Sequence, residues 1–417
     1  MHHFHYREGE LCAEEVPLRD LAERYGTPLY VYSHATLTRH IRRFQRAFGD
    51  DVLVAYSVKA NPNLAVIAAL AAEGAGADVV SRGELQRALA AGVPPERIVF
   101  AGVGKRRDEL ELALARGILQ LNVEVEGELE LLDELGRARG APAPVALRVN
   151  PDVPADTHRY IQTGNKADKF GIPLEEAPAM FRRAAALPGV EPVGVACHIG
   201  SQILRLEPFA EALARVRQLV LDLRAEGIDL RRIDIGGGLG VRYRDETPPT
   251  LEDYAGIVRK AVGDLGCELA AEPGRVILAN AGVLLTRVLY RKEVGEKRFV
   301  IVDQAMNDLQ RPALYDAFHD VWPVKEATQR IPADVVGPIC ETSDFLSRDG
   351  DVPDAQPGDL LCAMSAGAYG RSMSSNYNSR ARAAEVLVRG DEAFLIQERE
   401  TLESLWAGER IPGFLGG

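Results

Sequence analysis

The sequence lacks several features that mark whole classes of protein. Acidic residues outnumber basic ones, 61 against 49, and the formal net charge is −12 at pH 7. That balance argues against a surface for nucleic acid or for anionic membranes. No apolar run approaches the length of about 20 residues that a membrane-spanning helix requires. We therefore expect neither a nucleic-acid partner nor a membrane partner.

Cysteine is scarce, and its spacing shows no pairing pattern. The five cysteines are scattered, with no CxxC pair: Cys12, Cys197, Cys267, Cys340 and Cys362. Such a set fits free thiols in a reducing cytoplasm better than a disulfide framework. The N-terminal stretch MHHFHYREGE lacks the apolar core of a signal peptide. Its three histidines indicate a frayed terminus rather than a metal site. We expect a cytoplasmic protein without a metal.

The chain does contain a regular alternation of short apolar, β-rich runs with amphipathic helical stretches. The predicted strands are 52–58, 77–81, 97–102, 119–123, 145–150, 193–200, 231–236 and 267–272. The helical stretches have apolar residues at three-and-four spacing and include 82–92, 107–117, 126–140 and 208–227. Eight strand–helix units are the number in a TIM (β/α)8 barrel. A doubly wound sheet is the alternative, but no GxGxxG follows the first strand.

The pattern of alternating strands and helices ends after residue 282. Runs such as KRFVIVD and AEVLVRG suggest strands joined by Gly, Pro and Asp turns. Long helical patterns are rare here, which favours a mostly β domain of the sandwich or barrel kind. The predicted organisation is an α/β barrel over 29–282, and a β domain formed by 1–28 together with 283–417.

Unusual residues fall at the carboxyl ends of the predicted barrel strands, where active sites of TIM barrels lie. Lys59, Arg148 and His198 end the first, fifth and sixth strands, and glycines 236–238 and the stretch 272–275 follow the last two. Taken alone, Lys59 could be a surface lysine and His198 a core histidine, and the stretches 236–238 and 272–275 could be simple turns. Their coincidence on one face predicts a site. A reactive lysine, a glycine-rich anion cradle and a carboxylate are the parts that pyridoxal phosphate requires.

Seven motifs, in this order and spacing, resemble the diaminopimelate decarboxylases, which are fold-type III pyridoxal phosphate enzymes. The motifs are YSVKANPN, HIGSQ, DIGGGLG, EPGR, RPALYDAFH, GPICE and GAYGRSMSSNYNSR. The stretch YIQTGNKADKFGI at 160–172 also resembles that family. The resemblance runs over nearly the whole chain. Any one motif is weak evidence, but the set is specific.

The resemblance implies roles for individual residues. Lys59 would be the Schiff-base lysine and His198 would stack on the cofactor ring. The residues expected to hold the phosphate and the ring nitrogen are Ser201, Gly238, Glu272, Pro273, Gly274 and Arg275, with Tyr377 also touching the cofactor. The residues expected to bind the substrate are Arg275, Arg311, Tyr315, Glu341 and Tyr377. Cys340 would protonate the α-carbon, and the family's active sites are shared across a homodimer.

The chemistry of these residues is consistent with one substrate in particular. Two arginines and a tyrosine suit a carboxylate, and Glu341 suits an ammonium group. Together they fit the distal amino-acid head of meso-2,6-diaminopimelate, whose decarboxylation to L-lysine and CO₂ ends lysine biosynthesis. The alternatives are a decarboxylase of another diamino acid or of a carboxyalkylated polyamine, and a non-catalytic pyridoxal phosphate carrier. A racemase is disfavoured because an acid, Glu272, stands where the ring nitrogen would lie.

One departure from the family pattern lies beside the predicted acid. The chain has Thr342-Ser343 after the Cys340-Glu341 pair, where the family usually has Ser-Gly. Loss of that glycine would alter the turn that presents Cys340 if the position requires a positive φ.

Overall fold

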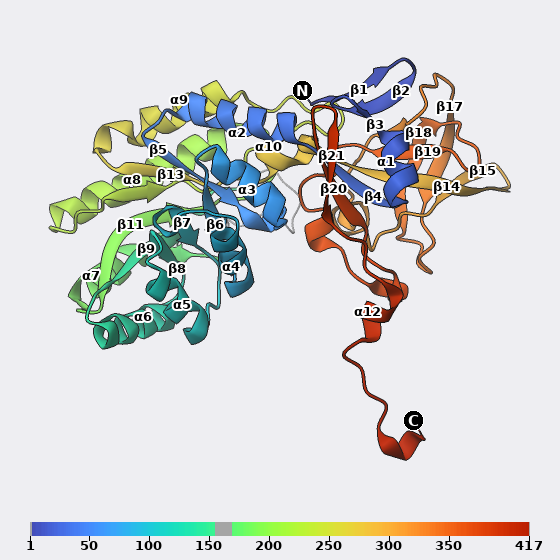
Figure 1. Ribbon diagram of the computed structural model, residues 1–417. Coiled ribbons are helices and arrows are strands. Elements are labelled where there is room, and N and C mark those ends of the chain that lie inside the picture. The colour runs from blue at the N-terminus through green and yellow to red at the C-terminus, as the bar shows by residue number, and fades with distance from the viewer. Residues whose placement is uncertain (1, 155–168, 417) are drawn as a thin grey trace. The chain divides into compact units, whose positions relative to one another are not determined.

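The computed structural model describes residues 2–154 and 169–416 (Figure 1). Residues 160–168 of the family-like stretch therefore lie outside the described residues. The chain divides into two compact units. One, the barrel unit, comprises residues 37–278, and the other, the β unit, comprises residues 1–36 and 279–417. Each unit is described by itself below.

Eight parallel strands form the barrel unit, and the predicted TIM barrel is confirmed. They are β5 (Val52–Ser57), β6 (Gly76–Val79), β7 (Ile98–Phe100), β8 (Gln120–Val123), β9 (Ala143–Asn150), β11 (Val190–Cys197), β12 (Arg232–Asp234) and β13 (Glu268–Ala271). Strand β13 pairs with β5, and β8 pairs with β9, which closes the sheet on itself. The short β10 (Ile172–Pro173) adds to β9. Closure brings the carboxyl ends of all eight strands to one face.

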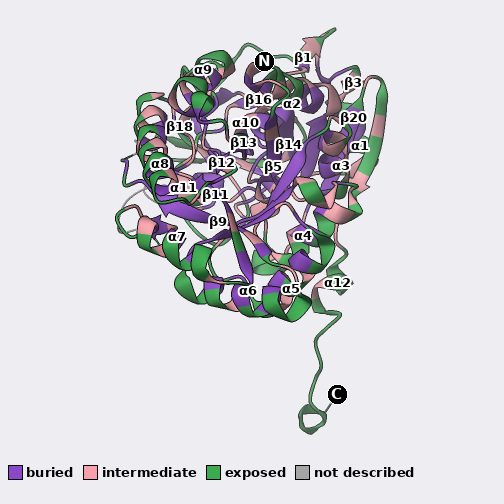
Figure 2. Ribbon diagram, turned by 90° about the vertical axis from the view of Figure 1, so that its left-hand side faces the viewer, coloured by how far each residue is buried: buried purple, intermediate pink, exposed green. Residues whose placement is uncertain are grey.

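Helices surround this barrel, with their exposed faces outward (Figure 2). They are α2 (His34–Phe48), α3 (Leu64–Ala72), α4 (Arg82–Ala90), α5 (Arg107–Arg116), α6 (Glu126–Arg139), α7 (Ala177–Ala186), α8 (Glu207–Ala225), α9 (Leu251–Val262) and the short α10 (Arg275–Leu278). Glycines in the left-handed conformation end α5 and α6, as glycine at that position commonly does. No helix among the described residues is both long and apolar enough to cross a membrane.

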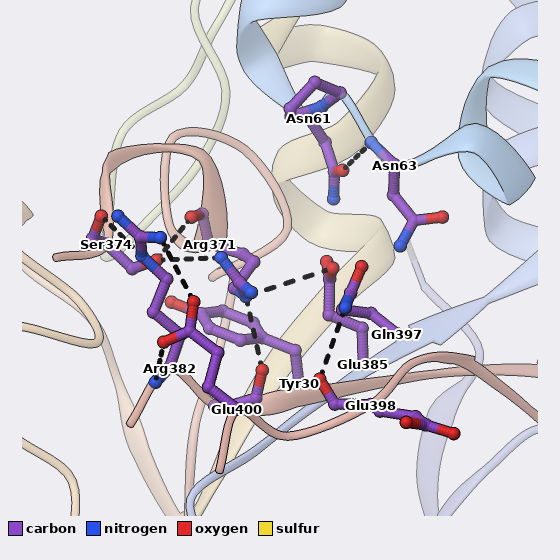
Figure 3. A network of polar contacts seen from close by, with 12 residues as sticks. Tyr30, Asn61, Asn63, Arg371, Ser374, Arg382, Glu385, Gln397, Glu398 and Glu400 are labelled. Carbon is purple, nitrogen blue, oxygen red and sulfur yellow. Dashed lines mark hydrogen bonds and ion pairs between the residues drawn. The ribbon is translucent and has the colours of Figure 1, made fainter. Parts of the chain in front are cut away.

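Local capping explains where the helices next to the site begin. The Asn63 side chain accepts a hydrogen bond from the Ala65 N–H at the start of α3. The Asn61 side chain accepts one from the Asn63 N–H, at 3.0 Å (Figure 3). Ser81 caps α4 in the same way through the Glu84 N–H. Such caps satisfy amide groups that a helix leaves without partners in its first turn. They place α3 shortly after the 3₁₀ turn that carries Lys59, and α4 shortly after the strand that carries Asp78.

The β unit is built on a mixed sheet, as the C-terminal sequence predicted. Its main path is β18 (Phe345–Pro353), β17 (Arg330–Val336), β15 (Lys297–Val302), β14 (Gly282–Val294), β4 (Leu29–Ser33), β20 (Ala384–Arg389) and β21 (Glu392–Gln397). Strands β16 (Val321–Pro323) and β19 (Leu360–Ala363) pair beside β14. A small sheet of β1 (Phe4–Arg7), β2 (Glu10–Ala13) and β3 (Val16–Pro17) precedes helix α1 (Leu18–Tyr25). Two short helices, α11 (Arg311–Tyr315) and α12 (Leu402–Trp406), complete the unit.

The boundary between the units follows strand pairing. The domain predicted from sequence as the barrel, residues 29–282, includes β4. In the structure β4 is fully buried between β14 and β20, and therefore belongs to the sheet of the β unit. The five residues of β4 form an apolar run that either unit could have buried, so composition alone did not decide which.

A matched pair of glycines in α6 tests how tightly the barrel is packed. A Cβ atom on Gly136 would lie 1.8 Å from the carbonyl oxygen of Gly189, whereas one on Gly127 would meet nothing within 4 Å. We expect Gly136→Ala to cost about 1–3 kcal/mol and lower the melting temperature in circular dichroism. Gly127→Ala should leave it unchanged or raise it by the equivalent of about 0.5–1 kcal/mol. Equal melting temperatures for the two variants would contradict this close contact.

Candidate active site

Lys59 lies just beyond strand β5, in a single 3₁₀ turn. Its Nζ atom is 2.8 Å from Oδ2 of Asp78, on the neighbouring strand β6. The Asp78 side chain is fully buried, whereas that of Lys59 is 38% exposed. The Ser57 hydroxyl lies 2.7 Å from the same Asp78 oxygen, and the two residues are partners in the β5–β6 register. A buried carboxylate requires such partners, so Asp78 fixes the direction of the Lys59 amine.

Two further carboxyl groups are buried close to this ion pair. Asp234 ends β12 and Glu272 follows β13, and both are almost inaccessible to solvent. Burial first, and then the neighbouring Asp234 and Asp78, raise the pKa of Glu272 well above its usual value, while Lys59 acts in the opposite direction. Burial likewise raises the pKa of Asp234. The Oε1 atom of Glu272 is buried and has no hydrogen-bond partner among the described residues, so it can receive a polar group from a ligand.

His198 follows β11 and presents its ring at the same end of the barrel. The Gly237 N–H donates to its Nδ1 atom at 3.1 Å. The proton of the neutral ring therefore resides on Nε2. Burial, and then the positive charges of Arg148 and Lys59, lower the pKa of His198 well below its usual value. His198 is thus a neutral, flat ring at pH 7.

The glycine-rich turn after β12 packs against the ends of neighbouring strands. A Cβ atom on Gly237 would lie 2.2 Å from the carbonyl oxygen of Glu272. One on Gly238, whose φ is +109°, would lie 2.3 Å from the carbonyl oxygen of Gly200. Only glycine permits both the conformation and the close approach. The turn therefore has a structural reason for its glycines beside the predicted contact with a phosphate.

Arg275, which follows β13, contacts polar residues that follow β11 and β12. Its Nη2 atom donates to the Ser201 hydroxyl at 3.1 Å, and its Nη1 atom donates to the Tyr243 hydroxyl at 2.8 Å. The carbonyl oxygen of Pro273 accepts from the Ser57 N–H at 3.1 Å, which joins this stretch to β5. Arg275 is 7% exposed, so its fixed charge faces Ser201 and Tyr243 rather than bulk water.

A cavity of about 340 Å³ opens at this end of the barrel. Lys59, His198, Glu272 and Arg148 line it together with apolar side chains. Arg148 pairs with buried Glu124, at 3.0 Å between Nη1 and Oε1. The volume lies within the range of about 300–1,000 Å³ that small-molecule sites occupy. The predicted lysine, imidazole and carboxylate thus share one pocket.

In the β unit, Arg311 begins α11 and is buried. Its Nη1 atom is 2.8 Å from Nε2 of His319, whose Nδ1 atom is 2.8 Å from the carbonyl oxygen of Met364. Nδ1 must donate to that carbonyl, so Nε2 accepts from the guanidinium. His319, which no sequence motif singled out, therefore orients Arg311. Tyr315, at the other end of the helix, is half-buried.

Two loops of the β unit bring Cys340 and Glu341 to Tyr377. The Tyr377 hydroxyl donates a short hydrogen bond to Oε1 of Glu341. This bond, and a second one from Ser343, lower the pKa of Glu341, and the same contact raises the pKa of Tyr377. The Cys340 N–H donates to the Asn378 side chain at 3.4 Å. Cys340 and Glu341 are both exposed.

The loop that presents Cys340 requires no glycine after the Cys-Glu pair. Neither Thr342 nor Ser343 has a positive φ. Asp344 closes the loop, because its two carboxylate oxygens accept from the N–H groups of Met306 and Ile339, each at 2.7 Å. The substitution that distinguishes this chain from the family pattern therefore leaves the loop without a strained residue at that point.

The predicted residues fall into two groups, one in each unit. The barrel unit carries Lys59, His198, Ser201, Gly238, Glu272, Pro273, Gly274 and Arg275 at the carboxyl ends of its strands. The β unit carries Arg311, Tyr315, Cys340, Glu341 and Tyr377. Asp78 and Asp234, which lie within predicted strands, were not among the residues predicted from sequence. An acidic residue inside an otherwise apolar strand was the available signal, because a charge there needs a partner.

Known proteins are similar to this chain in sequence and in fold. The family model described as "Pyridoxal-dependent decarboxylase, pyridoxal binding domain" matches residues 34–279. A diaminopimelate decarboxylase of Pseudomonas aeruginosa is 54% identical over 415 residues, which cover 98% of this chain and 99% of that protein. The crystal structure of diaminopimelate decarboxylase from Helicobacter pylori complexed with L-lysine has a TM-score of 0.91 at 44% identity, and covers 94% of this chain and 98% of that one. The M. jannaschii enzyme in co-complex with L-lysine has a TM-score of 0.94 at 38% identity, with 99% and 98% covered.

Glu84, a half-buried acid in α4, makes stability depend on pH in a direction that can be measured. Burial first, and then the neighbouring Asp78, raise the pKa of Glu84 from 4.5 to about 7. Ionising Glu84 therefore costs more free energy in the folded chain than in the unfolded chain. The free energy of unfolding is consequently highest below pH 4.5, and it falls as the pH rises through 7. Glu84→Gln removes this loss, at most about 3 kcal/mol. The melting temperature of the variant minus that of the wild type should increase between pH 4.5 and 7.5. A difference that stays constant would refute the assignment.

Proposed function

The chain belongs to the diaminopimelate decarboxylases, among the pyridoxal-dependent decarboxylases, and on that premise we propose that it converts meso-2,6-diaminopimelate into L-lysine and CO₂ with pyridoxal 5'-phosphate as cofactor. The observation that carries the proposal is the Lys59 amine, held by Asp78 in a cavity that it shares with buried Glu272. The relatives that were solved with L-lysine support an amino acid as the product. The reaction would be the last step of lysine biosynthesis.

The residues of the barrel fit pyridoxal phosphate. Lys59 has the amine for the covalent link, and the unpartnered Oε1 of Glu272 offers a partner for the ring nitrogen. His198 offers a neutral ring for stacking, and Ser201 and Gly238 would hold the phosphate. When bound, the cofactor supplies an electron sink that takes up the electron pair left as a carboxylate departs as CO₂.

Three groups at the carboxyl end of the barrel would control charge and protons there. Because burial favours the protonated form of Glu272, this carboxyl would share its proton with the ring nitrogen. Asp78 would hold the Lys59 ammonium whenever the lysine is not covalently engaged. His198, kept neutral by burial, would pack on the ring without adding a competing charge. Glu272 and His198 thus have the ionisation states that this chemistry needs.

Residues of the β unit would bind the substrate and complete the reaction. Arg311, oriented by His319, and Tyr315 would bind a carboxylate. Glu341, whose lowered pKa keeps it ionised, would bind the distal ammonium group. Loss of CO₂ leaves an electron pair on the α-carbon, and the product requires a proton there. We assign that proton to the thiol of Cys340.

A homodimer with shared active sites is part of this proposal. Cys340 and Glu341 are exposed, and Tyr377 is 45% exposed. Residues that bind substrate and donate a proton need a site closed to bulk water, which a second copy of the chain would provide. The five cysteines are free thiols, in keeping with the proposed location in a reducing cytoplasm.

A substrate panel tests the proposal. Purified protein loaded with pyridoxal phosphate should release CO₂ from meso-2,6-diaminopimelate with a kcat/KM that exceeds that for L-lysine, L-ornithine or L-arginine by about 100-fold or more, because a site built for polar groups rejects analogues that lack them. Higher activity on carboxynorspermidine would instead indicate a polyamine decarboxylase. Retention of the cofactor without turnover of any member would indicate a carrier.

Lys59→Ala should lower kcat/KM by about 1,000-fold or more, because the nucleophilic amine is lost. Borohydride treatment of the loaded wild type should fix a pyridoxyl group on Lys59, detected by mass spectrometry, and the variant should show none.

Mixing inactive Lys59→Ala and Cys340→Ala chains tests whether each active site takes residues from both chains of a dimer. Random pairing makes about half of the dimers mixed, and each mixed dimer has one complete site. The mixture should therefore recover about one quarter of wild-type activity. No restoration would contradict sites shared between chains.

A further inference from the structure

The turn at residues 376–380 of the β unit adopts an unfavourable backbone conformation. Asn378 and Ser379 are consecutive, neither is glycine, and both have positive φ values, 56° and 53°. Such residues cost free energy and persist only where the surrounding structure holds them. The turn must therefore be fixed by contacts from outside it.

This turn is also the one that meets the predicted catalytic loop. Tyr377 donates to Glu341, and the Asn378 side chain accepts from the Cys340 N–H at 3.4 Å. Two successive residues of one turn thus contact the proposed proton donor and the proposed binder of the distal ammonium group. A shift of the turn would move both groups together.

Asn376 and Glu400 hold the turn. The Nδ2 atom of Asn376 donates across the turn to the carbonyl oxygen of Arg380, at 3.0 Å, and to Oε2 of Glu400, at 2.6 Å. Oε2 of Glu400 also accepts from the Arg382 N–H at 2.9 Å, and Oε1 accepts from Nη1 of Arg382 at 3.2 Å (Figure 3). Partial burial acts to raise the pKa of Glu400, but these contacts outweigh it and lower the pKa. Glu400 is therefore an anion with donors on both oxygens.

A second set of contacts holds the segment before the turn. Arg371 donates to the Ser374 hydroxyl at 3.1 Å and to the carbonyl oxygen of Ala383 at 3.2 Å. Arg382 Nε donates to the carbonyl oxygen of Ser374 at 3.3 Å. Figure 3 shows these side chains gathered around Arg382 and Glu400. Arg380 also anchors the end of the turn, because its guanidinium donates to the Asn307 side chain at 3.1 Å and to the carbonyl oxygen of Asp303. Glu400 is the group that joins Asn376, at the start of the turn, to Arg382.

We infer that Glu400, about 60 residues beyond Cys340 in the chain, is a positioning residue that fixes the turn at 376–380 and through it Tyr377, Glu341 and Cys340. The inference rests on the proposed function for the roles of those three groups. Glu400 touches none of the reacting atoms and acts through Asn376 and Arg382. Its carboxylate is required because both oxygens accept from donors, and an amide would set an NH₂ group against one of them.

The chain offers a matched control for Glu400→Gln. Glu398 lies two residues earlier and is exposed. Figure 3 shows its side chain directed away from Arg382 and Glu400, and in the described part of the chain its carboxylate makes no ion pair. Glu398→Gln removes the same charge from the same segment without touching the turn. Any effect found only for Glu400→Gln therefore reports on the contacts with Asn376 and Arg382.

Hydrogen–deuterium exchange measures the position of the turn without relying on turnover. Glu400→Gln should speed exchange in peptides that contain 376–380 and 339–341, and Glu398→Gln should not. In steady-state assays Glu400→Gln should lower kcat/KM for meso-2,6-diaminopimelate about tenfold, the effect of losing a hydrogen bond to a charged group. Unchanged exchange in both peptides, or equal losses of activity in the two variants, would overturn the inference.

A double-mutant cycle separates positioning from general stability. If Glu400 acts through the turn, Glu400→Gln should cost much less in a Tyr377→Phe background than in the wild type. Additive losses would assign Glu400 a merely structural role and overturn the inference. If the wild type fails to release CO₂ from the substrate, the proposed function fails, and the exchange experiment still decides whether Glu400 fixes the turn.

Discussion

The ion pair between Lys59 and Asp78 is the interaction on which the barrel site depends. Asp78 is fully buried, and an unpaired carboxylate in that position would cost several kcal/mol. The lysine removes that cost, and in return the aspartate directs a flexible side chain toward the cavity. Ser57 contacts the same oxygen and lies opposite Asp78 in the register, so the pairing of β5 with β6 sets the geometry of the amine.

Closure of the barrel extends this local constraint to the other groups. Because β13 pairs with β5 and β12 pairs with β13, Glu272 and Asp234 end beside Lys59. The acids are then buried close together, which keeps their pKa values high. The Lys59 amine therefore lies beside two acids, Glu272 and Asp234, that burial keeps from ionising as readily as they would in water. The site is thus a property of the closed sheet and not of any one motif.

The functional groups of the β unit are held in place in a different way. Cys340 and Glu341 are exposed, so burial does not fix them, and hydrogen bonds have to do so. Asp344 closes the loop that carries them, and the turn at 376–380 contacts both. Glu400 holds that turn from a segment near the end of the chain. The barrel places its groups by packing and pairing, whereas the β unit places its groups by a chain of polar contacts.

Sequence alone was sufficient where the chemistry is local and periodic. Apolar runs alternating with amphipathic helices predicted the eight strands, because a strand buried on both faces must be apolar throughout. Lys59, His198 and Glu272 were found because they stand at the ends of such runs. Only the tertiary structure identified Asp78 as the partner of Lys59, His319 as the partner of Arg311, and Glu400 as the support of the turn at 376–380. It also decided that β4 belongs to the β unit. Each of these contacts joins residues that lie far apart in the sequence. Which distant segments lie side by side is decided by the free energy of burial over the whole fold, and not by the properties of the two residues in contact.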